Sequence, residues 1–372
     1  MLRKDMRKGI TTGTCAAAAA KAAVLAWCGQ SPAFVDVVSP QGQIIRVPVV
    51  LSEGTESGGR ASVVKDAGDD PDITNGVTVV SEVVIQPGPG AGETNVTIQA
   101  GPGVGTVTKP GLAVPAGEPA VNPGPRSMII QAVRETLPAG YEVIVTVSIP
   151  GGEQLAKRTL NPTLGIIGGL SIIGTTGIVE PMSEEAFKNS LTPQISVVRE
   201  LGYERIIFVP GKIGQDIAVK RYALPAEALV QTSNFVGHML ESAVRYGMKQ
   251  VLLFGHLGKI VKVSAGIFHT HNRMADARME TMAAYMAANG APQQAVQEVL
   301  ACTTTEAAMP VIAAYGQTGL YNLLAERASQ RAMRYVFGDL TVGTVIVTLQ
   351  GEILGLDEMA KEIGGSLGWN IK

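Results

Sequence analysis

The sequence predicts a two-domain α/β protein in which an N-terminal α+β domain precedes a Rossmann-like parallel α/β domain. The chain has 372 residues, and since one domain usually takes about 150 residues, two are expected. Strand patterns follow one another in the first part, most clearly over 141–150. Beyond about residue 155, strands alternate with helices, which is typical of a parallel sheet covered on both faces. We therefore expect domains over 1–155 and 156–372.

The first domain is expected to open with a helix over Cys15–Trp27, with Thr12 or Thr14 as its N-cap and Gly29 as its stop. The alanines of this helix have almost no side-chain bulk, so another backbone can approach it closely. Alternating apolar residues predict a hairpin over 35–50, strands over 77–86, 94–100 and 141–150, and a short helix over 127–137.

The second domain is expected to begin with a buried strand, LGIIGGLSII (164–173), that runs into a glycine-rich turn. Helices and strands then alternate. The expected elements are a helix over 183–202, a strand over 205–211, a helix over 223–247, a strand over 249–256, helices through residue 331 and a late strand over 344–351.

Composition excludes several classes of function. The formal net charge is −2, which gives no general attraction for nucleic acid or an anionic membrane. Charged residues make up 17% of the chain, below the roughly 25% of an average domain, so we expect a large core or association into a homo-oligomer. The three cysteines are widely spread and show no zinc spacing. They predict reduced thiols in the cytoplasm and no protein-bound metal.

The N-terminal stretch resembles an export signal only superficially. A basic segment precedes an apolar run, but Asp5 interrupts the first and Lys21 interrupts the second. An export signal needs about 7–15 uninterrupted apolar residues, and a membrane helix needs about 18. We expect neither.

The N-terminus of the opening helix is the first candidate site. Its N–H groups and positive dipole end favour a carboxylate or phosphate. Thr11, Thr12 and Thr14 supply hydroxyls, and Gly13 permits close backbone approach. The alternative is an ordinary capped packing helix.

An acidic cluster is the second candidate. Within the seven residues from 66 to 72 there are four aspartates, which are Asp66, Asp69, Asp70 and Asp72. Carboxylates this close raise one another's pKa and can form a base or a cation site, although the spacing does not match a calcium loop. The alternative is a turn, because Asp, Gly, Pro and Asn are turn formers.

A stretch rich in glycine and proline over 101–126 is the third candidate. Such a stretch makes stiff turns with exposed backbone, and Lys109 and Arg126 are its cations. The alternative is a rigid hairpin with a loop.

A second glycine-rich stretch, over 161–183, is the fourth candidate. In parallel α/β sheets, ligands bind beyond the carboxyl ends of the strands, where glycine lets a nucleotide approach the backbone. The stretch lacks GxGxxG and a phosphate-loop GKxT, so the pattern is weak. The candidate residues are Gly168, Gly169, Gly174, Thr175, Thr176 and Gly177.

Histidines after a strand end form the fifth candidate. His256, His269 and His271 lie near four cations, which are Lys259, Lys262, Arg273 and Arg278. His-x-His is poor evidence for zinc without two further ligands. A cationic rim for an anionic ligand suits the segment better, and solvated helix ends with a bonded histidine are the alternative.

Together these segments resemble the CbiD family, the cobalt-precorrin-5B C(1)-methyltransferases of anaerobic cobalamin biosynthesis. The matching blocks are GITTGTCAAAAAKAA, KDAGDDPDITNG, GVGTVTKPGL with NPGPR, GGLSIIGTTGIVEPMS and GHLGKIVKVSAGIFHTH. They occur in order from residue 9 to about residue 281, and the tail beyond is less diagnostic.

The resemblance implies methyl transfer from S-adenosylmethionine to a ring carbon of a cobalt-bearing tetrapyrrole. Such a macrocycle carries several carboxylate arms and needs an apolar surface rimmed by cations and helix N-termini. We expect S-adenosylmethionine beside the glycines of 168–177. The substrate is expected at Thr11, Thr12, Thr14, Lys109, Arg126, His256 and His271. Asp66 and His269 are the candidate bases if a proton must leave the ring.

Three other functions stay open. The first is a nicotinamide-dependent tetrapyrrole reductase, which the missing GxGxxG disfavours. The second is a non-catalytic corrinoid-binding protein. The third is a kinase of the sugar-kinase type, whose phosphate loop would need more Ser and Gly than TTGTC offers.

Overall fold

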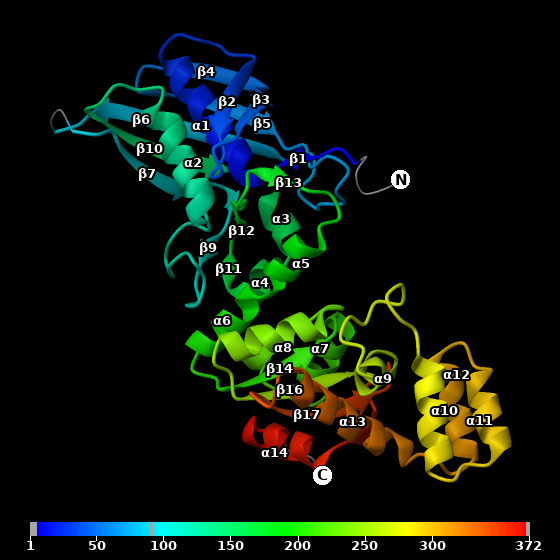
Figure 1. Cartoon of the computed structure of the whole chain (residues 1–372). Helices are drawn as coiled ribbons and strands as arrows, with labels where there is room; N and C mark the ends of the chain where they lie inside the picture. The colour runs from blue at the N-terminus through cyan, green and yellow to red at the C-terminus, as the bar shows by residue number, and fades with distance from the viewer. Residues whose placement is uncertain (1–5, 90–91, 370–372) are drawn as a thin grey trace. The chain divides into compact units, whose positions relative to one another are not determined.

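The computed structural model describes residues 6–89 and 92–369, and its elements are labelled in Figure 1. The chain is a mixed α/β protein that divides into two compact units, Met1–Glu184 and Glu185–Lys372. The boundary predicted after residue 155 therefore falls inside the first unit. The reason is strand pairing, because three short strands beyond that point pair with strands of the N-terminal part.

A five-stranded sheet forms the centre of the first unit, in the order β4-β5-β6-β10-β7. The pairs from β4 to β10 are antiparallel, and β7 runs parallel to β10. A separate hairpin, β2–β3, lies in the predicted range 35–50. The strand bounds are β2 (Phe34–Val38), β3 (Ile44–Pro48), β4 (Leu51–Thr55), β5 (Gly58–Val64), β6 (Thr78–Pro87), β7 (Asn95–Ala100) and β10 (Tyr141–Ser148).

Helix α1 (Thr12–Trp27) packs against this sheet and against α2 (Pro123–Arg134). The alanines of α1 from Ala16 to Ala20 are fully buried. The facing strands carry glycine at the contacts, and a Cβ on Gly59 would overlap the carbonyl of Ala23. Small residues on both sides thus allow backbone to pack on backbone, as the sequence predicted.

Pairs of two-residue strands join the last part of the first unit to its earlier segments. The pairs are β1 with β13, β8 with β12 and β9 with β11. The segment 164–173 was predicted as one buried strand, but it forms two separate two-residue strands. The remaining bounds are β1 (Gly9–Ile10), β8 (Gly103–Val104), β9 (Thr106–Val107), α3 (Gly152–Ala156), α4 (Asn161–Leu164), β11 (Ile166–Ile167), β12 (Gly169–Leu170) and β13 (Ile178–Val179). Helix α5 (Glu184–Leu191) begins at the last residue of this unit and lies otherwise in the second.

A second five-stranded sheet, ordered β15-β14-β16-β17-β18, organises the second unit. The first four strands are parallel and β18 is antiparallel to β17. Their bounds are β14 (Arg205–Val209), β15 (Leu229–Gln231), β16 (Gln250–His256), β17 (Thr341–Val347) and β18 (Ile353–Leu356).

Helices flank this sheet. Contacts place α7 against β14, β15 and β16, and α14 against β16 and β17, while α9 and α13 pack on each other and on β17. The predicted helix over 183–202 is two helices, because Pro193 begins a new one. The bounds are α6 (Pro193–Glu200), α7 (Lys212–Lys220), η2 (Ala226–Ala228), α8 (Val236–Arg245), α9 (Leu257–Ser264), α13 (Leu320–Tyr335) and α14 (Glu358–Ser366).

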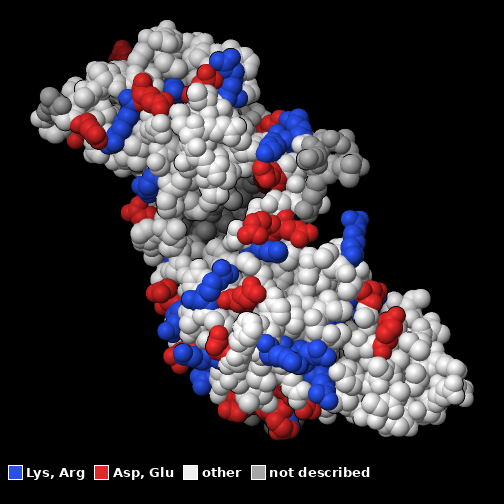
Figure 2. All heavy atoms as spheres, viewed as in Figure 1, with Lys and Arg blue, Asp and Glu red and all other residues white. Residues whose placement is uncertain are grey.

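Three further helices, α10 (Arg278–Ala288), α11 (Gln293–Leu300) and α12 (Thr305–Ala314), pack on one another. The sequence has no Lys or Arg between Arg278 and Arg327, and Figure 2 shows a nearly uncharged surface over these helices. Within the described residues, no helix is long and apolar enough to span a membrane.

Candidate functional site

The threonines around the start of α1 bind the chain's own backbone. Thr11 is the N-cap, and its hydroxyl accepts the Thr14 N–H at 3.2 Å. Thr14 Oγ1 donates to the carbonyl of Gly177 at 2.6 Å, and Thr12 Oγ1 accepts the N–H of Ile173 at 2.9 Å. All three threonines are at most 8% exposed. This geometry matches the capped packing helix, the second of the two interpretations of this segment.

The six residues predicted to bind the cofactor lie in the first unit, whereas the parallel sheet belongs to the second. A Cβ on Gly169 would overlap the backbone of Gly103, and a Cβ on Gly174 would overlap the side chain of Thr11. Packing against these neighbours therefore requires both glycines. The topological reason for the prediction does not hold, because β11, β12 and β13 pair with strands of the first unit. Of the six residues, Gly168 faces open space, Thr175 is exposed, and Thr176 and Gly177 continue the loop to β13.

Asp66, a candidate base, is held in an exposed ion pair. Its carboxylate binds both terminal nitrogens of Arg7 and accepts the N–H of Gly68 at 2.9 Å. The hydrogen bond from Arg7 is the main reason that the pKa of Asp66 lies below its ordinary value, and the Gly68 N–H adds to the effect. A carboxylate with a lowered pKa is a poor proton acceptor.

Another member of the acidic cluster forms a buried ion pair. Asp72 lies 2.5 Å from the ammonium of Lys65, whose side chain is 2% exposed. Its second oxygen accepts hydrogen bonds from the N–H and hydroxyl of Thr74, both at 2.7 Å. Burial raises the pKa of Asp72, but Lys65 and Thr74 outweigh burial, and the net shift is downward. The cluster is thus a turn fixed by internal bonds, the alternative that the turn-forming residues favoured.

Lys109 and Arg126 remain available at the surface of the first unit. The Lys109 ammonium lies 3.4 Å from the carbonyl of Thr163, and its stem packs on Gly165. Arg126, in α2, lies 3.5 Å from Glu118. Both residues are half-buried, so each keeps donors that can reach an anionic ligand.

The carboxyl end of β16 leads directly into α9. His256 ends the strand and caps the helix, because its Nδ1 accepts the N–H of Gly258 at 3.1 Å. The imidazole proton is therefore assigned to Nε2, which lies 2.5 Å from a carboxylate oxygen of Glu306 in α12. His256 is thus hydrogen-bonded at Nδ1 and faces the Glu306 carboxylate at Nε2, which matches the alternative to its predicted contact with substrate.

Two lysines of α9 converge on one carbonyl oxygen. Lys259 Nζ lies 3.4 Å and Lys262 Nζ 3.3 Å from the oxygen of Thr270. Lys259 also donates to Asn234 Oδ1 at 2.5 Å, and Lys262 to Asn272 Oδ1 at 2.7 Å. Burial is the main cause that lowers the pKa of each lysine. The predicted cationic segment thus contains a compact pair of ammonium groups.

The other two histidines lie on the segment that these lysines hold. His269 forms a β-bridge with Phe235, and the two ring centres are 4.8 Å apart. His271 is exposed, and its Nδ1 accepts the N–H of Arg273 at 3.1 Å. His269 belongs to the second unit and Asp66 to the first, so the two candidate bases come from different units.

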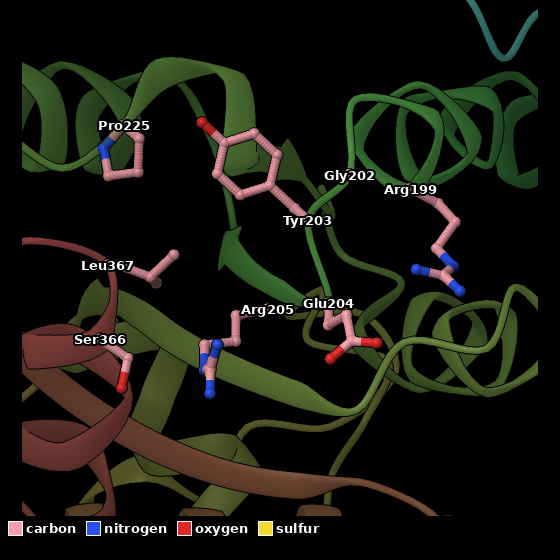
Figure 3. A pocket seen from close by; sticks show the side chains of 8 residues that line it. All are labelled: Arg199, Gly202, Tyr203, Glu204, Arg205, Pro225, Ser366 and Leu367. Carbon is pink, nitrogen blue, oxygen red and sulfur yellow. The ribbon is translucent and has the colours of Figure 1, made fainter.

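A cavity of about 440 Å³ opens at the amino end of β14. Figure 3 shows Arg205 there, with Ser366 and Leu367 of the C-terminal segment on one side and Glu204 on the other. Ligands of parallel α/β sheets bind at the opposite, carboxyl ends of the strands. The lining residues are Arg199, Gly202, Tyr203, Glu204, Arg205, Pro225, Ser366 and Leu367.

Some residues at the carboxyl edge of the second sheet were not predicted. They are Gly211, which follows β14, Asn234, which binds Lys259, and Glu306, which binds His256. Only Gly211 had a local signal, as a glycine of the Pro-Gly pair that ends the β14 segment. Among the described residues, no group of three or more His, Cys, Asp or Glu is placed to hold a metal ion.

Comparison with known families gives two matches along the chain. Residues 2–181 match the model of a family described as CbiD, and residues 269–358 match one described as CbiD, C-terminal domain. The first match ends close to the end of the first unit at Glu184.

Curated relatives match over nearly the whole chain. A protein of Moorella thermoacetica is 52% identical over 99% of both chains. A protein of Desulfitobacterium hafniense is 47% identical over 97% of this chain and 92% of its own. A protein of Methanocaldococcus jannaschii is 42% identical over 95% of this chain and 97% of its own. All three are named cobalt-precorrin-5B C(1)-methyltransferase.

One solved structure is also similar. It is the crystal structure of a cobalamin biosynthesis protein (cbiD) from Archaeoglobus fulgidus, which is 31% identical and covers 73% of this chain and 84% of its own, with a TM-score of 0.39.

Proposed function

The chain belongs to the CbiD family, and we propose that it is an enzyme of cobalamin biosynthesis that methylates C(1) of cobalt-precorrin-5B. The observation that carries this proposal is the 52% identity to the Moorella thermoacetica methyltransferase over 99% of both chains. Cobalt belongs to the substrate here, and the tetrapyrrole is the partner molecule that the enzyme must hold.

S-adenosylmethionine, the proposed co-substrate, supplies a methyl group already activated by its positive sulfonium. The protein therefore has to align that methyl with the ring carbon and keep water away, and orientation alone can contribute about 7–11 kcal/mol. The C–S bond breaks as the bond to C(1) forms with a ring electron pair, and S-adenosylhomocysteine leaves. This chemistry needs few reacting side chains.

The first unit is proposed to bind the carboxylate arms of the tetrapyrrole. Lys109 and Arg126 support this role because both are half-exposed and, among the described residues, each has one hydrogen-bond or ion-pair partner. Thr175 is exposed on the nearby glycine-rich loop. Thr11, Thr12 and Thr14 have an indirect role, since they hold that loop in place by hydrogen bonds to the backbone of Ile173 and Gly177.

His269 suits the role of base better than Asp66 does. The imidazole of His269 lies beside the ring of Phe235, and the lysine pair of α9 binds the carbonyl of the next residue, Thr270. Histidine is the side chain that most often serves as a general base. Asp66 is held by Arg7 with a lowered pKa. If a proton must leave the tetrapyrrole, His269→Gln should lower kcat and remove one limb of the pH dependence of kcat. Asp66→Asn should leave that pH dependence unchanged.

Incubation of the purified protein with cobalt-precorrin-5B and methyl-labelled S-adenosylmethionine tests the function. One labelled methyl group should enter each tetrapyrrole molecule. Lys109→Met should raise KM about tenfold with little effect on kcat, because a charge-assisted hydrogen bond is lost. Lys157→Met, a matched change on α3's exposed C-cap, should behave as the wild type. Oxidation of NADPH without methyl incorporation would instead establish a reductase.

A further inference from the structure

The second sheet contains a point where its connections leave in opposite directions. From β14 the chain passes through α7 to β15 on one side, and from β16 it continues through α9 toward β17 on the other. In doubly wound sheets, nucleotide-like ligands bind at the carboxyl ends of the two strands that flank such a point. The rule first applied to the glycines of 168–177 therefore points to β14 and β16.

The backbone at this edge is open. Gly211 follows β14 in an extended conformation with φ −177°, and a Cβ on it would meet no atom within 4 Å. Thr232, at the end of β15, donates its N–H to the last carbonyl of β14 at Val209, 2.8 Å away. The loops after β14 and β15 are thus joined, and Asn234 of the second loop reaches Lys259 of α9 at 2.5 Å.

The lysine pair gives this edge a positive charge without a bonded counterion. Among the described residues, no carboxylate forms an ion pair with Lys259 or Lys262, while Arg278 pairs with Asp276 at 2.6 Å. Lys262 is 1% exposed and has three oxygen acceptors. Lys259 has only two, one of them at 3.4 Å, so its third N–H is free for a ligand. Burial and mutual repulsion raise the free energy of the two charged lysines, and a bound anion would offset this rise.

We propose that this edge binds the S-adenosyl methyl donor, with the donor's carboxylate toward Lys259 and its nucleoside part along Gly211. The assignment rests on the proposed function, because methyl transfer is what requires such a donor. It moves the donor from the first unit, where the predicted glycines pack against Gly103 and Thr11, to the second.

Calorimetric titration with S-adenosylhomocysteine tests the assignment without turnover. Lys259→Met keeps the aliphatic stem and removes the charge, and Gly211→Ala places a methyl group in the open space. Each should weaken binding about tenfold or more, since a charged hydrogen bond or a close backbone contact is lost. Lys249→Met, at the opposite end of β16, is the matched control and should bind as the wild type. Circular dichroism and thermal melting confirm that each variant folds, and Gly211→Ala should fold normally because its Cβ meets no neighbour.

Other outcomes would refute the site, the assignment of the donor or the proposed function. Wild-type affinity in both Lys259→Met and Gly211→Ala would refute this site and leave the methyltransferase intact. If Lys259→Met lost affinity for uroporphyrin, a carboxylate-bearing tetrapyrrole, but not for S-adenosylhomocysteine, the edge would serve the substrate and the donor assignment would be wrong. No binding of S-adenosylhomocysteine to the wild type, with or without uroporphyrin, would overturn the assignment, and no methyl incorporation in the turnover assay would overturn the proposed function.

Discussion

At the scale of single residues, we expect the Lys65–Asp72 ion pair to contribute strongly to the free energy of unfolding. Lys65 is 2% exposed, and its ammonium has Asp72 at 2.5 Å. Asp72→Asn would keep the bonds from Thr74 but leave a buried charge without its partner, which should cost about 3 kcal/mol of unfolding free energy at pH 7. Because the pKa of Asp72 is lowered in the fold, the pair stabilises above the unfolded pKa of about 3.9 and its contribution fades as pH falls through the lower folded value.

Urea unfolding at pH 7, 5 and 3 measures this effect. The gap between wild type and Asp72→Asn should be full at pH 7 and 5 and should narrow below about pH 4. Asp36→Asn is the matched control, because Asp36 pairs with Arg46 on the surface, where the side chains are 45% and 72% exposed. It should change stability little. An equal loss in both variants would refute the special role of the buried pair.

At the scale of elements, α1 depends on close approach of backbones. Gly59→Ala would drive a Cβ into the carbonyl of Ala23. Since neither backbone can move without disturbing a helix most of whose residues are buried, the substitution should cost about 1–3 kcal/mol, the usual penalty of overpacking. Gly92→Ala, where a Cβ meets no atom within 4 Å, should have almost no effect. Thermal unfolding followed by circular dichroism distinguishes the two, and an unchanged midpoint for Gly59→Ala would refute backbone packing at this contact.

The same scale shows which elements the sequence could predict. The pattern over 141–150 predicted β10 (Tyr141–Ser148), and the pattern over 94–100 predicted β7 (Asn95–Ala100), because a half-buried strand needs strict alternation. Two-residue strands such as β8 and β12 have no local period. Their pairing of distant segments, which fixes 156–184 in the first unit, was therefore not predictable.

In the candidate site, too, the features visible in the local sequence were predicted, and those that depend on contacts between distant segments were not. The cations of α9 were recognised from sequence because charge is visible residue by residue. Asn234 was not, since its contact with Lys259 spans 25 residues and depends on where β15 ends. The internal bonds of Thr12, Thr14 and Asp66 were also invisible, because their partners lie far along the chain.

At the scale of the whole molecule, each unit has a hydrophobic core of its own. One core joins α1, α2 and the first sheet, from Cys15 to Ile172, and the other joins the second sheet with α7 and α14, from Ile207 to Trp369. We therefore expect two calorimetric transitions, with Gly59→Ala lowering only one of them. S-adenosylhomocysteine at a hundredfold its Kd should add about 2.7 kcal/mol to the unit that binds it, which corresponds to about 5–10 °C. If the donor binds at β14 and β16, the raised transition is the one that Gly59→Ala leaves in place. A rise in the transition that Gly59→Ala lowers would place the donor in the first unit, and a single transition for all forms would contradict independent cores.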